Sequence, residues 1–305
     1  MRILLLGAGG QLGQALLSVL WREYPYWEVI ALGRDECDIT KPRTLVLALR
    51  HHNPDVIING AAYTAVDHAE SEPDLADRVN HRAVMELARE TQALGALLVH
   101  FSTDYVFDGS GTRPWTEVDQ PRPLNVYGAS KYAGEQVIRE LCPHHLILRT
   151  SWLYGGGGAH FARTVLHRAK EGLPLRVVAD QWGAPTQVGW LAKMSLMALS
   201  QVLHSPTKAG LYHLSNQGET SWHGFALALV EEAHRLGLLA QSVTVHPILS
   251  EQWSQQAHRP LNSRLDCRLF STVFGITSSP WREELIIWLT SQSSAPAALD
   301  TCLFP

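Results

Sequence analysis

Hydrophobic residues in the first half of the chain form short runs separated by segments with helical spacing. Five apolar runs predict β-strands, at residues 3–6, 28–32, 55–59, 96–101 and 146–150. Helical spacing marks the stretches after the first run (11–21), before the fourth (around 79–88) and before the fifth, from Tyr127 onward. Strands that alternate with helices form a parallel sheet covered by helices on both faces. The pattern predicts an α/β fold with a doubly wound parallel sheet.

Beyond residue 150 the alternation becomes irregular. Four consecutive glycines at 155–158 break the pattern, and later apolar segments lie at 175–178, 191–203 and 225–236. We therefore expect one domain over residues 1–150. Residues 151–290 should form mostly a smaller mixed α/β lobe, with some return to the sheet, and residues 291–305 a flexible tail.

Composition excludes several classes of protein. Hydrophobic residues make up 46% of the chain and charged residues 18%, a globular balance, and the net charge of −4 comes from mixed acidic and basic residues. No basic run suggests nucleic-acid binding, and no apolar stretch is as long as a membrane span. The four cysteines are scattered, which favours reduced thiols and a cytoplasmic protein. The histidines lack metal-ligand spacing, so we expect no metal site.

A glycine-rich loop follows the first predicted strand and begins a helix. Gly7, Gly10 and Gly13 permit a tight turn, close approach of a pyrophosphate, and close packing of helix on strand. The helix N-terminus supplies partial positive charge for phosphates. At the first strand–helix junction this spacing predicts dinucleotide binding, so residues 1–150 are interpreted as a Rossmann domain; simple turn chemistry is the alternative.

The residues that follow the second predicted strand indicate which nicotinamide cofactor is preferred. An acidic residue there accepts a hydrogen bond from the ribose 2′-hydroxyl of NAD, whereas this chain has Arg34, whose guanidinium suits the 2′-phosphate of NADPH. Asp35 and Glu36 follow directly, and a solvated loop arginine is the alternative interpretation. NADPH is favoured, with NADH as the alternative cofactor.

Three residues predict proton-transfer chemistry. Tyr127 and Lys131 lie one helical turn apart, so the ammonium group can lower the pKa of the phenol and bind the nicotinamide ribose. Thr103 ends the fourth predicted strand, at the sheet edge where ligands bind. Glycine loop, strand-end hydroxyl and Tyr-x-x-x-Lys, in this order, resemble the extended short-chain dehydrogenases.

More specific motifs resemble the dTDP-4-dehydrorhamnose reductase family across about 260 residues. The matching segments are 10–13 (GQLG), 62–70 (AYTAVDHAE), 102–109 (STDYVFDG), 125–128 (NVYG), 149–152 (RTSW), 183–186 (GAPT), 210–213 (GLYH) and 259–265 (RPLNSRL). The resemblance implies reduction of the C4 keto group of dTDP-4-dehydro-L-rhamnose to dTDP-L-rhamnose, for polysaccharide biosynthesis. It also implies that the substrate is a dTDP-linked 4-keto-6-deoxy sugar.

The resemblance assigns roles to individual residues. The catalytic hydroxyl falls on Thr103, the proton donor on Tyr127 and the lysine on Lys131. Cofactor contacts fall on Gly10, Gln11, Leu12, Asp38, Ile39, Ala62, Tyr63 and Thr64. Substrate contacts fall on Thr103, Asp104, Trp152, Arg259 and Asn262, although Trp152 alone also fits a core aromatic residue.

Departures from the family pattern concern the metal and the assembly. Some members hold Mg²⁺ with glutamates at a dimer interface, and two matching positions here are Ala15 and Gly189, which cannot ligate. His258 stands where a second arginine is common. We expect no metal, and the quaternary state stays open, a homodimer included.

Two competing functions remain. A sugar-nucleotide epimerase or other reductase has the same fold, but dehydratases place Asp-Glu after the threonine, whereas Tyr105 follows Asp104 here. The family also resembles the non-catalytic beta subunit of methionine adenosyltransferase. The presence of Thr103, Tyr127 and Lys131 favours an enzyme.

Overall fold

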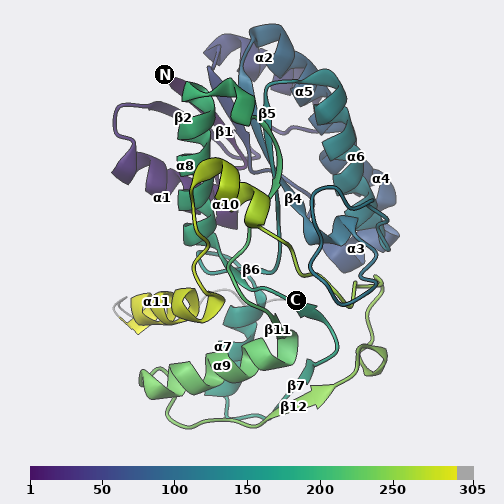
Figure 1. Cartoon of the computed structure of the whole chain (residues 1–305), viewed down its shortest axis with the longest axis vertical. Helices are drawn as coiled ribbons and strands as arrows, with labels where there is room; N and C mark the ends of the chain where they lie inside the picture. The colour runs from purple at the N-terminus through teal and green to yellow at the C-terminus, as the bar shows by residue number, and fades with distance from the viewer. Residues whose placement is uncertain (294–305) are drawn as a thin grey trace.

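A computed structural model describes residues 1–293 of the chain, and its centre is a six-stranded parallel sheet (Figure 1). The strand order is β10–β5–β4–β3–β1–β2. The strands are β1 (Arg2–Leu6), β2 (Glu28–Leu32), β3 (Val56–Asn59), β4 (Leu97–Thr103), β5 (His145–Thr150) and β10 (Gly210–His213). The five predicted strands are confirmed to within two residues at each end, as is the doubly wound α/β class.

Helices cover both faces of this sheet. One face carries α1 (Gln11–Glu23), α8 (Val188–His204) and α10 (Arg268–Phe274); the other carries α2 (Pro42–His52), α5 (Ala83–Leu94) and α6 (Val126–Leu141). Alternate side chains of β1 serve the two layers, since Ile3 and Leu5 pack with α1 and α8 whereas Leu4 and Leu6 pack with α2 and α5. Burial on both faces explains why the strands are almost continuously apolar.

The segment between β3 and β4 differs from the single long helix that was predicted. It contains α3 (Val66–Ser71), α4 (Pro73–Asp77), a π-helical turn over Arg78–Arg82, and then α5. Pro73 lacks an N–H group and begins a new helix, which interrupts the first one. The π-helical turn places Asn80 toward α6.

A smaller lobe lies below the sheet in Figure 1. Its core joins α7 (Phe161–Lys170), α9 (Trp222–Arg235) and α11 (Trp281–Ser293) to the parallel pair β7 (Leu175–Val178) and β12 (Val245–Ile248). Two further short pairs connect it to the rest: β6 (Leu153–Tyr154) with β9 (Thr186–Gln187), and β8 (Trp182–Gly183) with β11 (Thr220–Ser221). Within residues 1–293, three 3₁₀ turns complete the elements, at Asp104–Val106, Pro206–Lys208 and Ser250–Gln252.

The chain passes repeatedly between lobe and sheet. It leaves the sheet after β5, returns through α8 and β10, re-enters the lobe at β11, and returns once more through α10. Helix α11 extends through Ser293, three residues into the predicted tail, and the rest of that prediction lies outside the described residues. None of the helices within residues 1–293 has the length and apolar character needed to cross a membrane.

Candidate active site

The glycine loop lies where the sheet changes winding direction. From β1 the chain goes to β2 on one side, while β3 lies on the other. Parallel sheets bind ligands at the carboxyl ends of strands at this point. A cavity of about 320 Å³ lies there, lined by Gly7, Gly9, Gly10, Arg34, Cys37, Asp38, Ile39, Thr40, Gly60, Ala61, Ala62, Tyr63, Leu75 and Val79.

The backbone geometry explains the three glycines. Gly7 has a φ of +74°, and a Cβ atom there would lie 2.6 Å from the Ala61 nitrogen. A Cβ atom on Gly13 would overlap the Gly7 carbonyl oxygen, whereas one on Gly9 would meet nothing within 4 Å. Gly10 caps α1 without a side-chain hydrogen bond. The first amides of α1 are therefore available to an anion, and the loop fits a pyrophosphate.

The predicted cofactor residues divide into two groups. Those that line this cavity are Gly7, Gly10, Arg34, Asp38, Ile39, Ala62 and Tyr63. The others lie beside it: Gln11 donates a hydrogen bond to the Gly155 carbonyl at 2.6 Å, Leu12 and Gly13 are buried in α1, and Thr64 is exposed after β3. Arg34 is exposed at the cavity, as contact with a 2′-phosphate requires.

Asn80 supports this cavity and was not predicted from the sequence. Its Oδ1 atom accepts a hydrogen bond from the Tyr63 nitrogen at 2.9 Å, and its Nδ2 atom donates to the Tyr63 carbonyl and to Ser130 Oγ, both at 3.0 Å. It thus connects the loop after β3 to α6. One feature of the sequence could have indicated it: Asn80 lies at helical spacing from the apolar residues Val84 and Leu87, on the face that should be buried. A buried amide requires hydrogen-bond partners, so such a position points to a structural role.

Thr103, Tyr127 and Lys131 come together at the carboxyl end of β4. Thr103 is the last residue of β4, and Tyr127 lies in the first turn of α6 with Lys131 one turn further on. Asn125 begins that helix by accepting a hydrogen bond from the Gly128 nitrogen at 2.7 Å. A Cβ atom on Gly128 would overlap the Tyr105 carbonyl oxygen, so glycine allows α6 to approach the Thr103 segment closely.

Lys131 is held in a buried polar chain. It is 2% exposed, and its ammonium group donates to the Phe101 carbonyl at 2.7 Å and lies 3.3 Å from His100 Nε2. His100 Nδ1 in turn lies 3.1 Å from Asn59 Nδ2. Burial lowers the pKa of Lys131 to about 8 and that of His100 well below its usual value, so His100 is neutral. His100 and Asn59 were not predicted, since nothing in the sequence brings them to Lys131.

Tyr127 differs from expectation in its acidity. Burial raises the pKa of its phenol and outweighs an interaction with Thr103, which lowers it. We expected the Lys131 ammonium group to lower the pKa of the Tyr127 phenol. It does not do so here, because this ammonium group is directed to the Phe101 carbonyl. The phenol therefore stays protonated at neutral pH and can act as an acid.

A buried ion pair fixes the helix that carries Tyr127 and Lys131. Glu135 of α6 accepts two hydrogen bonds from Arg149 of β5, at 2.9 and 2.6 Å, and both side chains are almost completely buried. The guanidinium group also lies over the Phe107 ring. This pair connects α6 to β5, the strand next to β4, and so holds the helix that carries Tyr127 and Lys131 against the sheet.

A second cavity, of about 300 Å³, lies in the lobe. Its lining includes Trp222, Trp253, Arg168, Arg176 and Arg259 but no carboxylate. Among the described residues, neither Arg168 nor Arg176 has a hydrogen-bond or ion-pair partner. Flat indole rings beside unpaired guanidinium groups suit an anion that carries an aromatic base.

Arg259 joins this cavity to the catalytic group. It donates to Asp67 Oδ2 at 2.6 Å, while its Nε atom is buried without a hydrogen-bond partner in the described chain. Arg259 also interacts with the hydroxyl of Tyr105, whose ring lies edge-on to Tyr127 with centroids 5.9 Å apart. The second cavity and the proton donor are therefore neighbours.

The remaining predicted substrate residues are less accessible. Trp152 has a φ of +51° and is buried by stacking on Trp222, with centroids 3.7 Å apart. It thus supports the wall of the second cavity, and its predicted contact with the substrate stays a prediction. Asn262 is also buried, and its amide donates to the Arg113 carbonyl at 2.8 Å.

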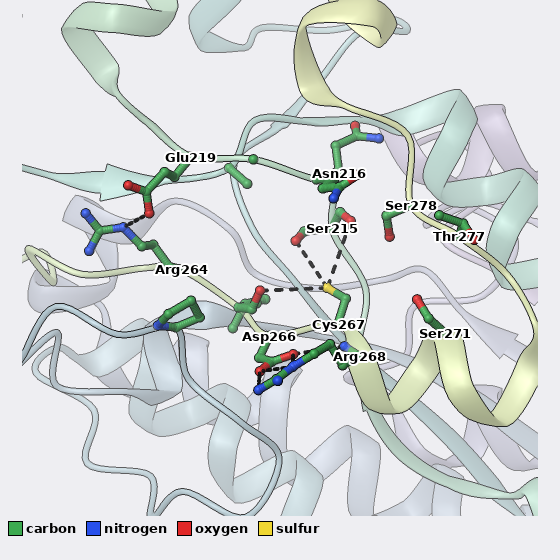
Figure 2. Close-up of a pocket in the computed structure, with 15 residues that line it drawn as sticks. Ser215, Asn216, Glu219, Arg264, Asp266, Cys267, Arg268, Ser271, Thr277 and Ser278 are labelled. Carbon is green, nitrogen blue, oxygen red and sulfur yellow. Dashed lines mark hydrogen bonds and ion pairs between the residues drawn. The ribbon is translucent and has the colours of Figure 1, made fainter.

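Figure 2 shows a third cavity, of about 470 Å³, that contains none of the predicted site residues. Its charges are paired within it: Arg264 with Glu219 at 2.6 Å, and Arg268 with Asp266 at 2.5 Å. Burial raises the pKa of the Cys267 thiol to about 11, which makes it a poor nucleophile. Paired charges and an unreactive thiol give this cavity no evident chemistry.

Comparison with known proteins agrees with this geometry. The family model described as "RmlD substrate binding domain" matches residues 1–293. The dTDP-4-dehydrorhamnose reductase of Salmonella typhimurium is 42% identical over 285 residues, which covers 92% of this chain and 94% of that protein.

Solved structures give the same result. A dTDP-4-dehydrorhamnose reductase of Bacillus anthracis, crystallised in complex with NADP, superposes with a TM-score of 0.87 at 36% identity and covers 95% of this chain and 99% of that one. The reductase of Clostridium acetobutylicum gives a TM-score of 0.88 at 34% identity, covering 96% and 100%. With the strand-end threonine, the Tyr-x-x-x-Lys pair and the glycine loop in place, the chain belongs to the dTDP-4-dehydrorhamnose reductase family.

Proposed function

We propose that this protein reduces the C4 keto group of dTDP-4-dehydro-L-rhamnose to give dTDP-L-rhamnose, using NADPH. The observation that carries this proposal is the group of Thr103, Tyr127 and Lys131 at the carboxyl end of β4, next to a cavity that fits a dinucleotide. We further propose that the reaction takes place in the cytoplasm, where scattered cysteines remain reduced.

The residues of the glycine loop would hold the pyrophosphate on the free amides of α1. Arg34 would hold the 2′-phosphate, and Asp38, Ile39, Ala62 and Tyr63 would line the adenosine side of the cavity. When bound, NADPH supplies a hydride to the substrate carbonyl carbon. Gln11, Leu12, Gly13 and Thr64 lie beside the cavity; Leu12 and Gly13 would hold α1 against the glycine loop, and Gln11 is hydrogen-bonded to the Gly155 carbonyl.

Two hydroxyl groups would act on the carbonyl oxygen. Thr103 donates a hydrogen bond to it, and Tyr127 transfers its phenolic proton to the oxygen as negative charge develops there. The high pKa of Tyr127 keeps that proton in place before the reaction. Lys131 then stabilises the phenolate and helps to hold the nicotinamide ribose, once it exchanges the Phe101 carbonyl for these partners.

The second cavity would take the nucleotide half of the substrate. Arg168 and Arg176 are unpaired cations that suit the diphosphate, and the buried Nε atom of Arg259 provides a further donor. Trp222 offers a flat surface for the thymine ring, supported from behind by Trp152. Asp104 lies behind Thr103, to which it is hydrogen-bonded, and would reach the sugar only beside that hydroxyl group, with Asn262 holding the neighbouring loop.

The decisive test is turnover of NADPH with dTDP-4-dehydro-L-rhamnose, measured for the wild type and for Tyr127→Phe. We expect the variant to bind NADPH normally and to lose about 10²–10⁴-fold in kcat, because only the transferable proton is removed. Tyr132→Phe on the same helix is the matched control and should keep its activity. No turnover by the wild type would favour a regulatory subunit, and a Tyr127→Phe enzyme with more than a tenth of wild-type kcat would exclude Tyr127 as the acid.

A further inference from the structure

Asp104 places a carboxyl group in the protein interior, directly beside the catalytic hydroxyl. The residue is 3% exposed, and its Oδ1 atom accepts a hydrogen bond from Thr103 Oγ1 at 3.0 Å. Its Oδ2 atom is buried and has no hydrogen-bond partner among the described residues. An ionised carboxylate in this position is stabilised only in part by Thr103, Ser263 and the backbone N–H groups of residues 104 and 105, because the hydration lost on burial outweighs these interactions. The surroundings therefore favour the neutral acid.

The Thr103 hydroxyl has only one proton to donate. It accepts a hydrogen bond from the Tyr105 nitrogen at 3.2 Å and gives its own proton to Asp104. A hydroxyl group can accept twice but donate only once. While Thr103 donates to Asp104, it cannot donate to the substrate carbonyl, as the proposed function requires.

We propose that Asp104 is a positioning residue that sets the direction of the Thr103 hydroxyl through its own protonation. A protonated Asp104 donates its O–H to Thr103 Oγ1, and the threonine proton then turns to the C4 oxygen. An ionised Asp104 instead keeps the threonine proton. No proton is transferred in this step, and each oxygen keeps an allowed number of hydrogen bonds. This inference rests on the proposed reductase function.

The acidities of the surrounding groups agree with such a switch. Burial raises the pKa of Asp104 to about 7, against interactions with Ser263 and Thr103 that lower it. The titratable groups that face it are Tyr105 of the same turn, Tyr127 of α6 and, across Tyr105, the Arg259–Asp67 pair. Because Asp104 is protonated below its pKa, the active arrangement dominates below pH 7 and is lost above it. Tyr127 stays protonated over this range, and Lys131 titrates nearer 8.

The test is the pH profile of kcat at saturating NADPH and keto-sugar. Titration of Asp104 alone, with a pKa of about 7, should lower the wild-type rate by about 30-fold between pH 6 and pH 8.5, and the titration of Lys131 adds to this fall at the upper end of the range. In Asp104→Asn the amide always donates to Thr103. The fall in kcat near pH 7 should therefore disappear, and only the fall caused by titration of Lys131 should remain. Asp104→Ala offers no donor and should have a reduced kcat at every pH. The control is Glu117→Gln. Burial also raises the pKa of the Glu117 carboxyl group, which accepts a hydrogen bond from the His213 backbone nitrogen. The pH profile of kcat of this variant should keep the fall near pH 7.

A step near pH 7 that survives in Asp104→Asn would overturn the proposal, as would a folded Asp104→Asn enzyme that is inactive at every pH. A carbon-detected NMR titration of the Asp104 carboxyl in the wild type needs no variant and should give a midpoint near 7; a midpoint below 5 would also overturn it. The wild-type rate at pH 6 tests the proposed function separately, because it does not depend on the variants.

Discussion

The cofactor preference depends on one exposed side chain, Arg34, at the edge of the glycine-loop cavity. Arg34→Ala should raise KM for NADPH by roughly 10–100-fold, because a hydrogen bond between charged groups contributes about 1.5–3 kcal/mol. KM for NADH should change little, since NADH has no 2′-phosphate. Steady-state kinetics with both cofactors provide the measurement.

Arg43→Ala is a suitable control for Arg34→Ala, because Arg43 is an exposed arginine of α2 outside the cavity lining. It should leave both KM values unchanged. If Arg34→Ala changes KM for NADPH and NADH equally, or changes neither, Arg34 does not bind the 2′-phosphate and is a solvated loop residue.

Single residues also show what sequence reasoning can reach. Thr103, Tyr127 and Lys131 could be proposed as a group from their types, order and spacing, and the structure brings them to the carboxyl end of β4, while their catalytic roles remain a prediction. Asn80 and His100 were missed, because their partners lie 17 to 50 residues away along the chain. The acidity of Tyr127 was predicted with the wrong sign, since burial and the direction of the Lys131 ammonium group depend on tertiary packing.

At the level of elements, the position of α6 depends on the Glu135–Arg149 pair. Glu135→Gln leaves the buried guanidinium group without its counter-charge, and removal of one partner from a buried pair costs about 3–5 kcal/mol. Urea unfolding of the variant should show a loss of this size in the free energy of unfolding.

Glu232→Gln gives the comparison for Glu135→Gln. Glu232 pairs with Arg235 on the surface of α9, and such a pair contributes about 0–1 kcal/mol. Equal losses in the two variants would mean that burial of the Glu135–Arg149 pair has no special importance for stability.

Elements with strong patterns were predictable and weakly patterned ones were not. The five strands appeared as apolar runs because helices cover both faces of the sheet. Helix α2 was not predicted, since only Leu45 and Leu49 are buried along its length. Strand β10, at the edge of the six-stranded sheet, has four residues whose pairing with β5 cannot be read from local sequence.

For the whole molecule, we predict activity and assembly without magnesium. Ala15 has no donor atom in its side chain and Gly189 has no side chain, whereas Mg²⁺ usually needs one or two carboxylates. Initial rate and solution mass should be the same in excess EDTA and in millimolar Mg²⁺. A several-fold loss of rate, or dissociation of an oligomer on chelation, would contradict this.

The late return of β10 to the sheet has a consequence during protein synthesis. Strand β5 ends at Thr150, but its outer neighbour β10 is complete only at His213. At a translation rate of about 5–20 residues per second, the growing polypeptide waits roughly 3–13 seconds for this strand. Throughout that interval the open edge of β5 presents unpaired backbone groups, which are a template for pairing with another nascent polypeptide. Until β10 pairs with β5, early contact with a chaperone would protect this edge.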